Sequence, residues 1–160
     1  MDVLFGSLTN LLTTLTNNRE IFARYRPHQF SSAPFQFRVW SINLRMSQHS
    51  LSDFALSVIS FHEQIIGAHS FINRAQTNTD MARGYALLLE TINSFAKAPV
   101  LPFDVKAIAI FDEMRSQKVR VSTMDLRIAL IAISNNLVLL TRNTGDFSKV
   151  PSLITEDWTT

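Results

Sequence analysis

The segment TMDLRIALIAISNNLVLLTRNTGDF, residues 123–147, is strongly apolar and has an acidic residue near each end. Its first half has a helical pattern, because apolar residues recur at helical spacing from Met124 to Ile133. Thr123 precedes this pattern and is suited to cap the helix, and Asp125 would then lie beside the positive end of the helix dipole. The first half of the segment therefore predicts a helix that starts near an acid.

The second half of the segment predicts a buried strand. Ser-Asn-Asn at 134–136 breaks the helical pattern, and the unbroken apolar run at 137–140 is typical of a parallel strand covered on both faces. Asp146 follows that strand, at the edge where ligands bind in open parallel α/β sheets. Asp125 and Asp146 could therefore meet at one edge, or they could be only a first-turn acid and a turn residue.

Composition predicts one globular domain. The chain has 160 residues, 46% of them hydrophobic and only four of them glycine, which is enough to bury a sizeable core. The absence of cysteine excludes disulfides, thiolate zinc sites and cysteine nucleophiles. The opening lacks the positive region of a signal peptide and no apolar run reaches membrane-spanning length, so we expect a soluble, cytoplasmic protein without a membrane partner.

The chain changes character near residue 45. Residues 1–45 carry five arginines and two acids, net +3, whereas 46–160 carry ten basic and eleven acidic residues, net −1. From Leu51 onward, strand and helix patterns alternate as in βαβ units with a parallel sheet. The predicted elements are a strand at 54–60, helices at 61–76 and 80–97, a strand at 100–104 and a helix at 105–117. The atypical N-terminal segment predicts only a weak helix over 8–25 and a strand over 35–42.

Glu63 is a third acid in an equivalent position. It follows the strand predicted to end near Ser60 and falls in the first turn of the next helix, which assigns it to the same sheet edge as Asp125 and Asp146. A carboxylate cluster is the usual means of holding Mg²⁺ or Mn²⁺, which can activate water for phosphodiester cleavage. The alternative is that each acid only complements a helix dipole.

Four motifs together resemble the PIN-domain ribonucleases, especially VapC-type toxins of bacterial toxin–antitoxin pairs. They are SVISFHEQ, VLPFD, TMDLRIALIAI and LVLLTRNTGDFSKVPSLITEDW, and the resemblance covers about residues 46–158. It implies a three-layer α/β/α domain with a parallel sheet, spanning 1–160 with 1–45 as an atypical N-terminal segment and 46–158 as the family-like body. It also implies cleavage of RNA with Mg²⁺ or Mn²⁺, and a cognate antitoxin as partner.

The resemblance also assigns roles to individual residues. Glu63, Asp125 and Asp146 are similar to the second, third and fourth metal-binding acids of the family, and Thr141 and Asn143 to polar residues that line the same pocket. The family's first acid ends a central strand, but Phe5 stands at that point here. The segment 1–45 is then either a diverged N-terminus of an inactive relative or the result of a start-site or reading-frame change near Met46.

Two further patterns leave alternatives open. An apolar stripe on the 80–97 helix could be core or a homodimer surface, and it consists of Tyr85, Leu88, Leu89, Ile92 and Phe95. Several basic residues could contact an RNA backbone or could be solvated surface, namely Arg74, Arg83, Arg115, Lys118, Arg120, Arg127 and Arg142. The competing function is a catalytically silent module that binds an antitoxin or RNA.

Overall fold

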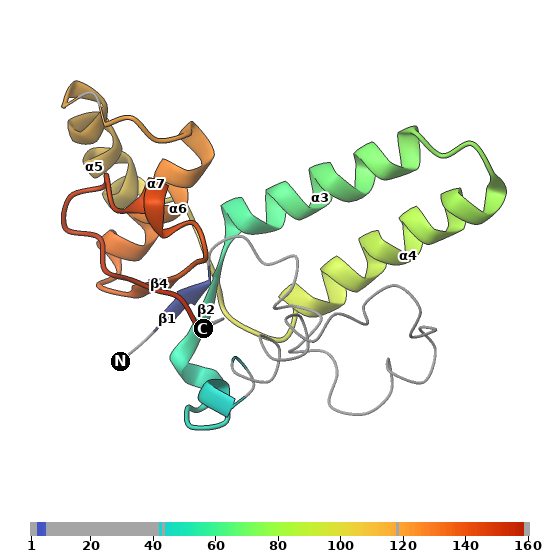
Figure 1. Cartoon of the computed structure of the whole chain (residues 1–160), viewed down its shortest axis with the longest axis horizontal. Coiled ribbons are helices and arrows are strands. Elements are labelled where there is room, and N and C mark those ends of the chain that lie inside the picture. The colour runs from blue at the N-terminus through green and yellow to red at the C-terminus, as the bar shows by residue number, and fades with distance from the viewer. Residues whose placement is uncertain (1–2, 6–41, 43, 118, 159–160) are drawn as a thin grey trace.

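Within the residues that the structure describes, five parallel strands form the sheet on which the other elements are arranged (Figure 1). The structure is a computed structural model and describes residues 3–5, 42, 44–117 and 119–158. The strands follow the spatial order β3-β2-β1-β4-β5. Their bounds are β1 Val3–Phe5, β2 Phe54–Ser57, β3 Val100–Leu101, β4 Val138–Leu140 and β5 Thr155–Glu156. All pairings are parallel, as the alternation of strand and helix patterns predicted.

The N-terminal strand β1 lies at the centre of this sheet. It pairs with β2 on one side and with β4 on the other, so that Phe5 is in register with Leu56 and with Leu140. The sequence predicted only a weak helix and a later strand in the N-terminal segment, yet the structure contains this central first strand. Phe5 is its last residue, and it therefore stands at the carboxyl edge of the sheet between the ends of two neighbouring strands.

The helices connect these strands. Their bounds are α3 Val58–Asn73, α4 Asn78–Phe95, α5 Val105–Ser116, α6 Thr123–Ser134 and α7 Thr144–Phe147, and a single 3₁₀ turn, η2, spans Leu51–Asp53. In Figure 1, α5, α6 and α7 gather at one end of the molecule, and α3 and α4 run side by side away from the sheet. Within the described residues, no helix is long and apolar enough to cross a membrane.

Two helix starts differ from the sequence predictions. The strand expected at 54–60 ends at Ser57, because the Ser57 hydroxyl accepts a hydrogen bond from the Ile59 N–H at 3.0 Å and caps α3 three residues early. Glu63 therefore lies in the second turn of α3, not in the first. In α6, the capping side chain is Ser122 and not Thr123, since the Ser122 hydroxyl accepts from the Asp125 N–H.

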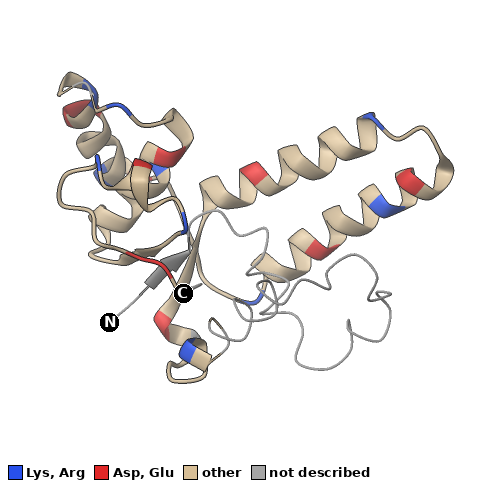
Figure 2. Ribbon diagram, in the orientation of Figure 1, with Lys and Arg blue, Asp and Glu red and all other residues tan. Residues whose placement is uncertain are grey.

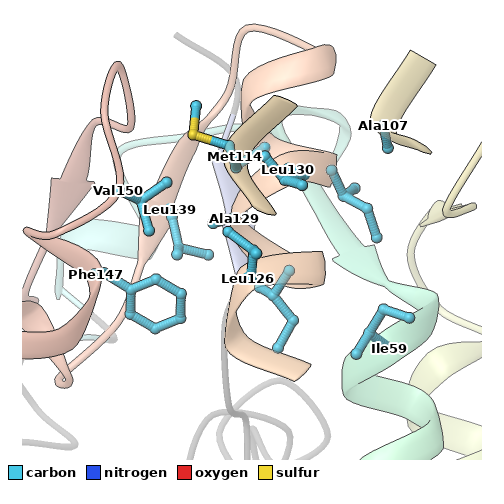
Figure 3. Packing of buried hydrophobic residues seen from close by; sticks show 12 residues of the cluster. Ile59, Ala107, Met114, Leu126, Ala129, Leu130, Leu139, Phe147 and Val150 are labelled. Atoms are coloured by element: carbon cyan, nitrogen blue, oxygen red, sulfur yellow. The ribbon is translucent and has the colours of Figure 1, made fainter. Parts of the chain in front are cut away.

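The core lies on both faces of the sheet. Along β4 the side chains alternate, with Leu139 in one apolar cluster and Val138 and Leu140 in the other. The larger cluster surrounds α6, whose residues from Ile128 to Ala132 are all buried. Figure 3 shows this helix between β4, α7 and α5. A helix that is apolar all round is expected to be enclosed in this way.

The second cluster packs against the opposite face. Phe95 at the end of α4 and Trp158 near the C-terminus cover Phe54 and Leu56 of β2. Trp158 meets the Phe54 ring edge-on at 6.1 Å and donates from its indole nitrogen to the Glu156 carboxylate at 2.7 Å. The last described residues are thus tied to the sheet by both an apolar and a polar contact.

The sequence predictions for the N-terminal segment fall mostly outside the described residues. The helix expected over 8–25 lies entirely there, as does the strand expected over 35–42 except for its last residue. That residue, Ile42, is helical and buried in the second cluster. The apolar stripe predicted on the 80–97 helix is divided, because Phe95 is core whereas Tyr85, Leu89 and Ile92 are exposed.

Helices α3 and α4 approach closely at a glycine. Gly84 in α4 is buried, and a β-carbon at this position would lie 2.5 Å from Ile72 Cγ1 and 3.3 Å from Ile72 Cα in α3. Ile72 could move its side chain, but its backbone could move only if the two helices separated. Gly67 in α3 provides a comparison, because a β-carbon there would meet nothing within 4 Å.

These two glycines predict opposite effects of the same substitution. Gly84→Ala should lower stability by about 1–3 kcal/mol through overpacking. Gly67→Ala should raise it by about 0.5–1 kcal/mol, because alanine loses less backbone entropy in a helix. Thermal unfolding of the two variants measures both changes in stability, because each kcal/mol shifts the melting temperature by about 2–4 °C in a chain of this size. Equal shifts in the two variants would show that the helices do not touch at Gly84.

Candidate active site

The three predicted metal-binding acids share one edge of the sheet. Glu63 lies on α3, which follows β2, and Asp146 lies on α7, which follows β4. Helix α6 leads into β4 through a short turn, so its first turn, with Asp125, lies at the carboxyl ends of the strands. This is the edge where open parallel sheets bind ligands. The start of each of the three helices, α3, α6 and α7, therefore lies at the sheet edge that the sequence predicted.

Glu63 and Asp125 are close enough to interact. Partial burial raises the pKa of the Glu63 carboxyl, the negative charge of Asp125 raises it further, and His62 opposes these effects. Both acids are half-buried. Two carboxylates held near each other at a partly desolvated edge form a site that a cation would stabilise.

Asp125 also has a local structural role. Its carboxylate accepts a hydrogen bond from the Ser122 hydroxyl at 2.8 Å, while its N–H donates to the same hydroxyl at 3.1 Å. This reciprocal pair closes the first turn of α6 and fixes one carboxylate oxygen. The metal-binding and the helix-start interpretations of Asp125 are therefore compatible, because one carboxylate has two oxygens.

Asp146 has partners of its own. Its carboxylate accepts from the Lys149 ammonium and, at 3.1 Å, from the Asn143 side-chain amide. The hydrogen bond from Lys149, then that from Asn143, then the Lys149 charge, lower the pKa of Asp146. Thr141 in turn holds this loop, since its hydroxyl accepts from the Asn143 N–H at 3.1 Å. Thr141, Asn143 and Asp146 thus form one hydrogen-bonded group.

The three acids do not form a single cluster in the structure. Among the described residues, no group of three or more histidine, aspartate or glutamate side chains is close enough to hold a metal ion. The structure brings Glu63 and Asp125 together and leaves Asp146 bound to Lys149. Sequence reasoning missed Lys149, although its spacing of three residues from Asp146, just after a short helix, was a usable signal.

Comparison with solved structures gives a consistent result. A chain of the DNA-bound VapBC complex from Salmonella typhimurium superposes with a TM-score of 0.62 at 22% identity, over 99% of this chain and 98% of that one. A chain of VapBC2 from Rickettsia felis, bound to a promoter DNA fragment, gives 0.64 at 17% identity over 99% of each chain. A chain of VapBC-1 from nontypeable Haemophilus influenzae gives 0.60 at 23% identity over the whole of both chains.

These likenesses establish the fold. It is an α/β fold with parallel strands, shared with chains of toxin–antitoxin complexes, and consistent with the VapC-like PIN domain expected from the sequence motifs. No family model matches the sequence, and no curated protein matches it either. Sequence identity alone therefore does not assign the chain to a family, and its activity has to be argued from the site.

The raised pKa of Glu63 predicts how stability depends on pH. The folded chain binds the proton of the Glu63 carboxyl more tightly than the unfolded chain does. Protonated Glu63 therefore contributes to the free energy of unfolding below the ordinary pKa of glutamate, and this contribution is lost as pH rises through the raised pKa. Glu63→Gln should therefore raise the melting temperature in EDTA at about pH 7 and have little effect at about pH 4. A gain of the same size at both pH values would contradict the raised pKa.

Proposed function

We propose that this chain is a VapC-like PIN domain with three-layer α/β/α architecture, built to cleave RNA phosphodiester bonds with a divalent metal ion. The observation that carries the proposal is the pair of acids Glu63 and Asp125 on different helices at the carboxyl edge, close enough for the charge of Asp125 to raise the pKa of Glu63. The fold shared with chains of VapBC complexes supports it, as do the apolar clusters on both faces of the sheet.

The residues present are suited to a hard cation. Mg²⁺ and Mn²⁺ prefer carboxylate oxygens, and the candidate ligands are Glu63, Asp125 and Asp146. A bound cation would supply an activated water and neutralise charge on the phosphate. Ser122 holds one Asp125 oxygen in place, and Asn143 does the same for Asp146. Lys149 would have to leave Asp146, or remain as a second positive charge facing the substrate phosphate.

Phe5 occupies the position of a metal-binding acid and should lower the activity of the unmodified chain. In the family pattern, the first metal-binding acid ends the central strand, and Phe5 ends β1 between β2 and β4. The loss of one carboxylate leaves a cation that prefers near-octahedral oxygen coordination more weakly held. We therefore expect little or no RNA cleavage by the unmodified chain, and a gain when an acid is placed at this position.

The substitution Phe5→Asp provides a direct test. Mg²⁺-dependent cleavage of a mixed RNA pool should increase by at least about tenfold over the unmodified chain. Phe5→Asn is the matched control, because asparagine has nearly the same shape as aspartate but carries no charge. Adding Asp125→Asn to Phe5→Asp should abolish the gain. Calorimetric titration with Mn²⁺ should show tighter binding by Phe5→Asp than by the other variants.

The outcomes separate the two candidate functions. Strong cleavage by the unmodified chain, lost in Asp125→Asn, would show that the fourth acid is dispensable. No cleavage by any variant, with the folds intact by circular dichroism, would favour a catalytically silent module that binds an antitoxin or RNA. Phe5 and the Asp146–Lys149 ion pair are the features that favour this second function.

We also propose that the α3–α4 hairpin binds a cognate antitoxin. Large apolar side chains are exposed along these two helices, namely Ile66, Phe71, Met81, Tyr85, Leu87, Leu89 and Ile92. Large apolar side chains gathered on an exposed surface mark a protein interface. The structures with this fold are of toxin–antitoxin complexes, which favours an antitoxin over a second copy of the chain.

Serine substitutions on the hairpin test this interface. Tyr85 and Leu89 are 57% and 58% exposed, so Tyr85→Ser with Leu89→Ser should leave the fold intact. The double variant should bind a co-expressed cognate antitoxin at least about tenfold more weakly, since buried aromatic residues dominate interface energies. Val105→Ser, at a residue that is 79% exposed on α5, is the control. A dimer of the unmodified chain alone that the double variant dissociates would instead assign the face to self-association.

A further inference from the structure

A pocket lies between α5 and α6, outside the group of acids. It has a volume of about 330 Å³, and its polar and aromatic lining comes from Phe111 and Arg115 of α5 and Thr123 and Arg127 of α6. Val119, Val121 and Leu126 form its apolar part. A volume of this size is at the lower end of the range for small-molecule sites and is sufficient for a single nucleotide base with part of its backbone.

Two arginines are held over one aromatic ring in this pocket. The Arg115 guanidinium carbon lies 5.7 Å from the centre of the Phe111 ring, and the Arg127 carbon lies 5.9 Å from it. Phe103 supports the ring edge-on at 5.9 Å. Cation–π contacts of this kind fix the position of a guanidinium group without neutralising it.

Neither guanidinium is paired with an acid of the described part of the chain. The ion pairs found among the described residues are His49–Asp53, Arg83–Asp80 and Lys149–Asp146, and none of them includes Arg115 or Arg127. Two like charges beside one ring repel each other. The arrangement is therefore incomplete electrostatically, and an anionic ligand would stabilise it.

The surrounding segment extends the positive field. Residues 111–127, which span the pocket lining, contain the basic residues Arg115, Lys118, Arg120 and Arg127 and the acids Asp112, Glu113 and Asp125, a net charge of +1. Figure 2 shows basic residues at the end of α5 and on the connection to α6. A field of this kind attracts a polyanion more strongly than it attracts a small ion.

We propose that this pocket binds one nucleotide of a single-stranded RNA, with a phosphate between Arg115 and Arg127 and the base against the apolar wall. Arginine is the side chain best suited to phosphate, because its planar fork donates two parallel hydrogen bonds. Phe111 is a positioning residue that holds both guanidinium groups. Helix α6 contributes Thr123 and Arg127 to the pocket, whereas Asp125, two residues from each of them, lies on another face of the same helical turn and belongs to the acidic pair.

The pocket proposal rests on the proposed function because it takes RNA as the ligand. Binding of RNA to the pocket can nevertheless be measured without cleavage. The assay is fluorescence anisotropy of a labelled single-stranded RNA in EDTA, with the full chain carrying Asp125→Asn. Arg115→Gln and Arg127→Gln should each weaken binding about tenfold, the loss expected for one charge-assisted contact. Each should also lower the slope of log affinity against log salt by about one. Phe111→Leu should weaken binding less while leaving the salt slope unchanged.

Arg83→Gln is the matched control. It removes the same charge from α4, where Arg83 is exposed and paired with Asp80 at 3.5 Å, and it should leave RNA affinity unchanged. If Arg115→Gln and Arg127→Gln behave like Arg83→Gln, the pocket does not bind RNA and the proposal is wrong. It is equally overturned if an oligoglutamate peptide of matched charge displaces the RNA at the same concentration as unlabelled RNA does, because the pocket would then accept acidic peptides.

The two proposals fail separately. If RNA binding depends on both arginines but Phe5→Asp gains no cleavage, the pocket stands and the catalytic function fails. If Phe5→Asp cleaves RNA and its Michaelis constant is indifferent to Arg115→Gln and Arg127→Gln, the catalytic function stands and the pocket proposal is overturned. Circular dichroism of each variant confirms that the comparison is between folded chains.

Discussion

Burial of α6 is the constraint on which the arrangement of the other elements depends. The middle of this helix is apolar on every side, with all residues from Ile128 to Ala132 enclosed, so it has to be covered by the sheet on one side and by α5 and α7 on the other. Once α6 is enclosed, the short turn into β4 fixes its direction and sets Asp125 at the carboxyl edge. An acid near that edge is therefore a consequence of packing as well as of local helix chemistry.

The same constraint explains how much of the fold could be read from the sequence. The change from helical spacing to an unbroken apolar run located α6 and β4 to within a residue, because both elements are buried and their patterns are strong. The end of β2 was mispredicted, since Val58 and Ile59 are β-branched and favour strands. A single hydroxyl, that of Ser57, starts α3 at this point, and a local hydrogen bond of this kind is weakly encoded in composition.

The site was predictable in its location but not in its contacts. Parallel topology alone assigns Glu63, Asp125 and Asp146 to one edge. Which acids interact depends on helix tilt and on competing partners, and here Lys149 holds Asp146 while the charge of Asp125 acts on Glu63. The paired arginines on Phe111 depend on the packing of α5 against α6, so spacing within either helix could not reveal them. The sequence had marked Arg115 and Arg127 only as general candidates for an RNA backbone contact.

The lengths of the outer strands have a consequence for the behaviour of the chain at high concentration. Both edge strands, β3 and β5, contain only two residues, whereas the longer strands lie between them. An unpaired strand edge is a template for pairing with another chain, and its risk increases with its length. The sheet of this protein ends on each side in a segment too short to support a stable intermolecular ladder. Self-association through the sheet is thereby disfavoured, and contacts between chains are directed to side-chain surfaces of the helices.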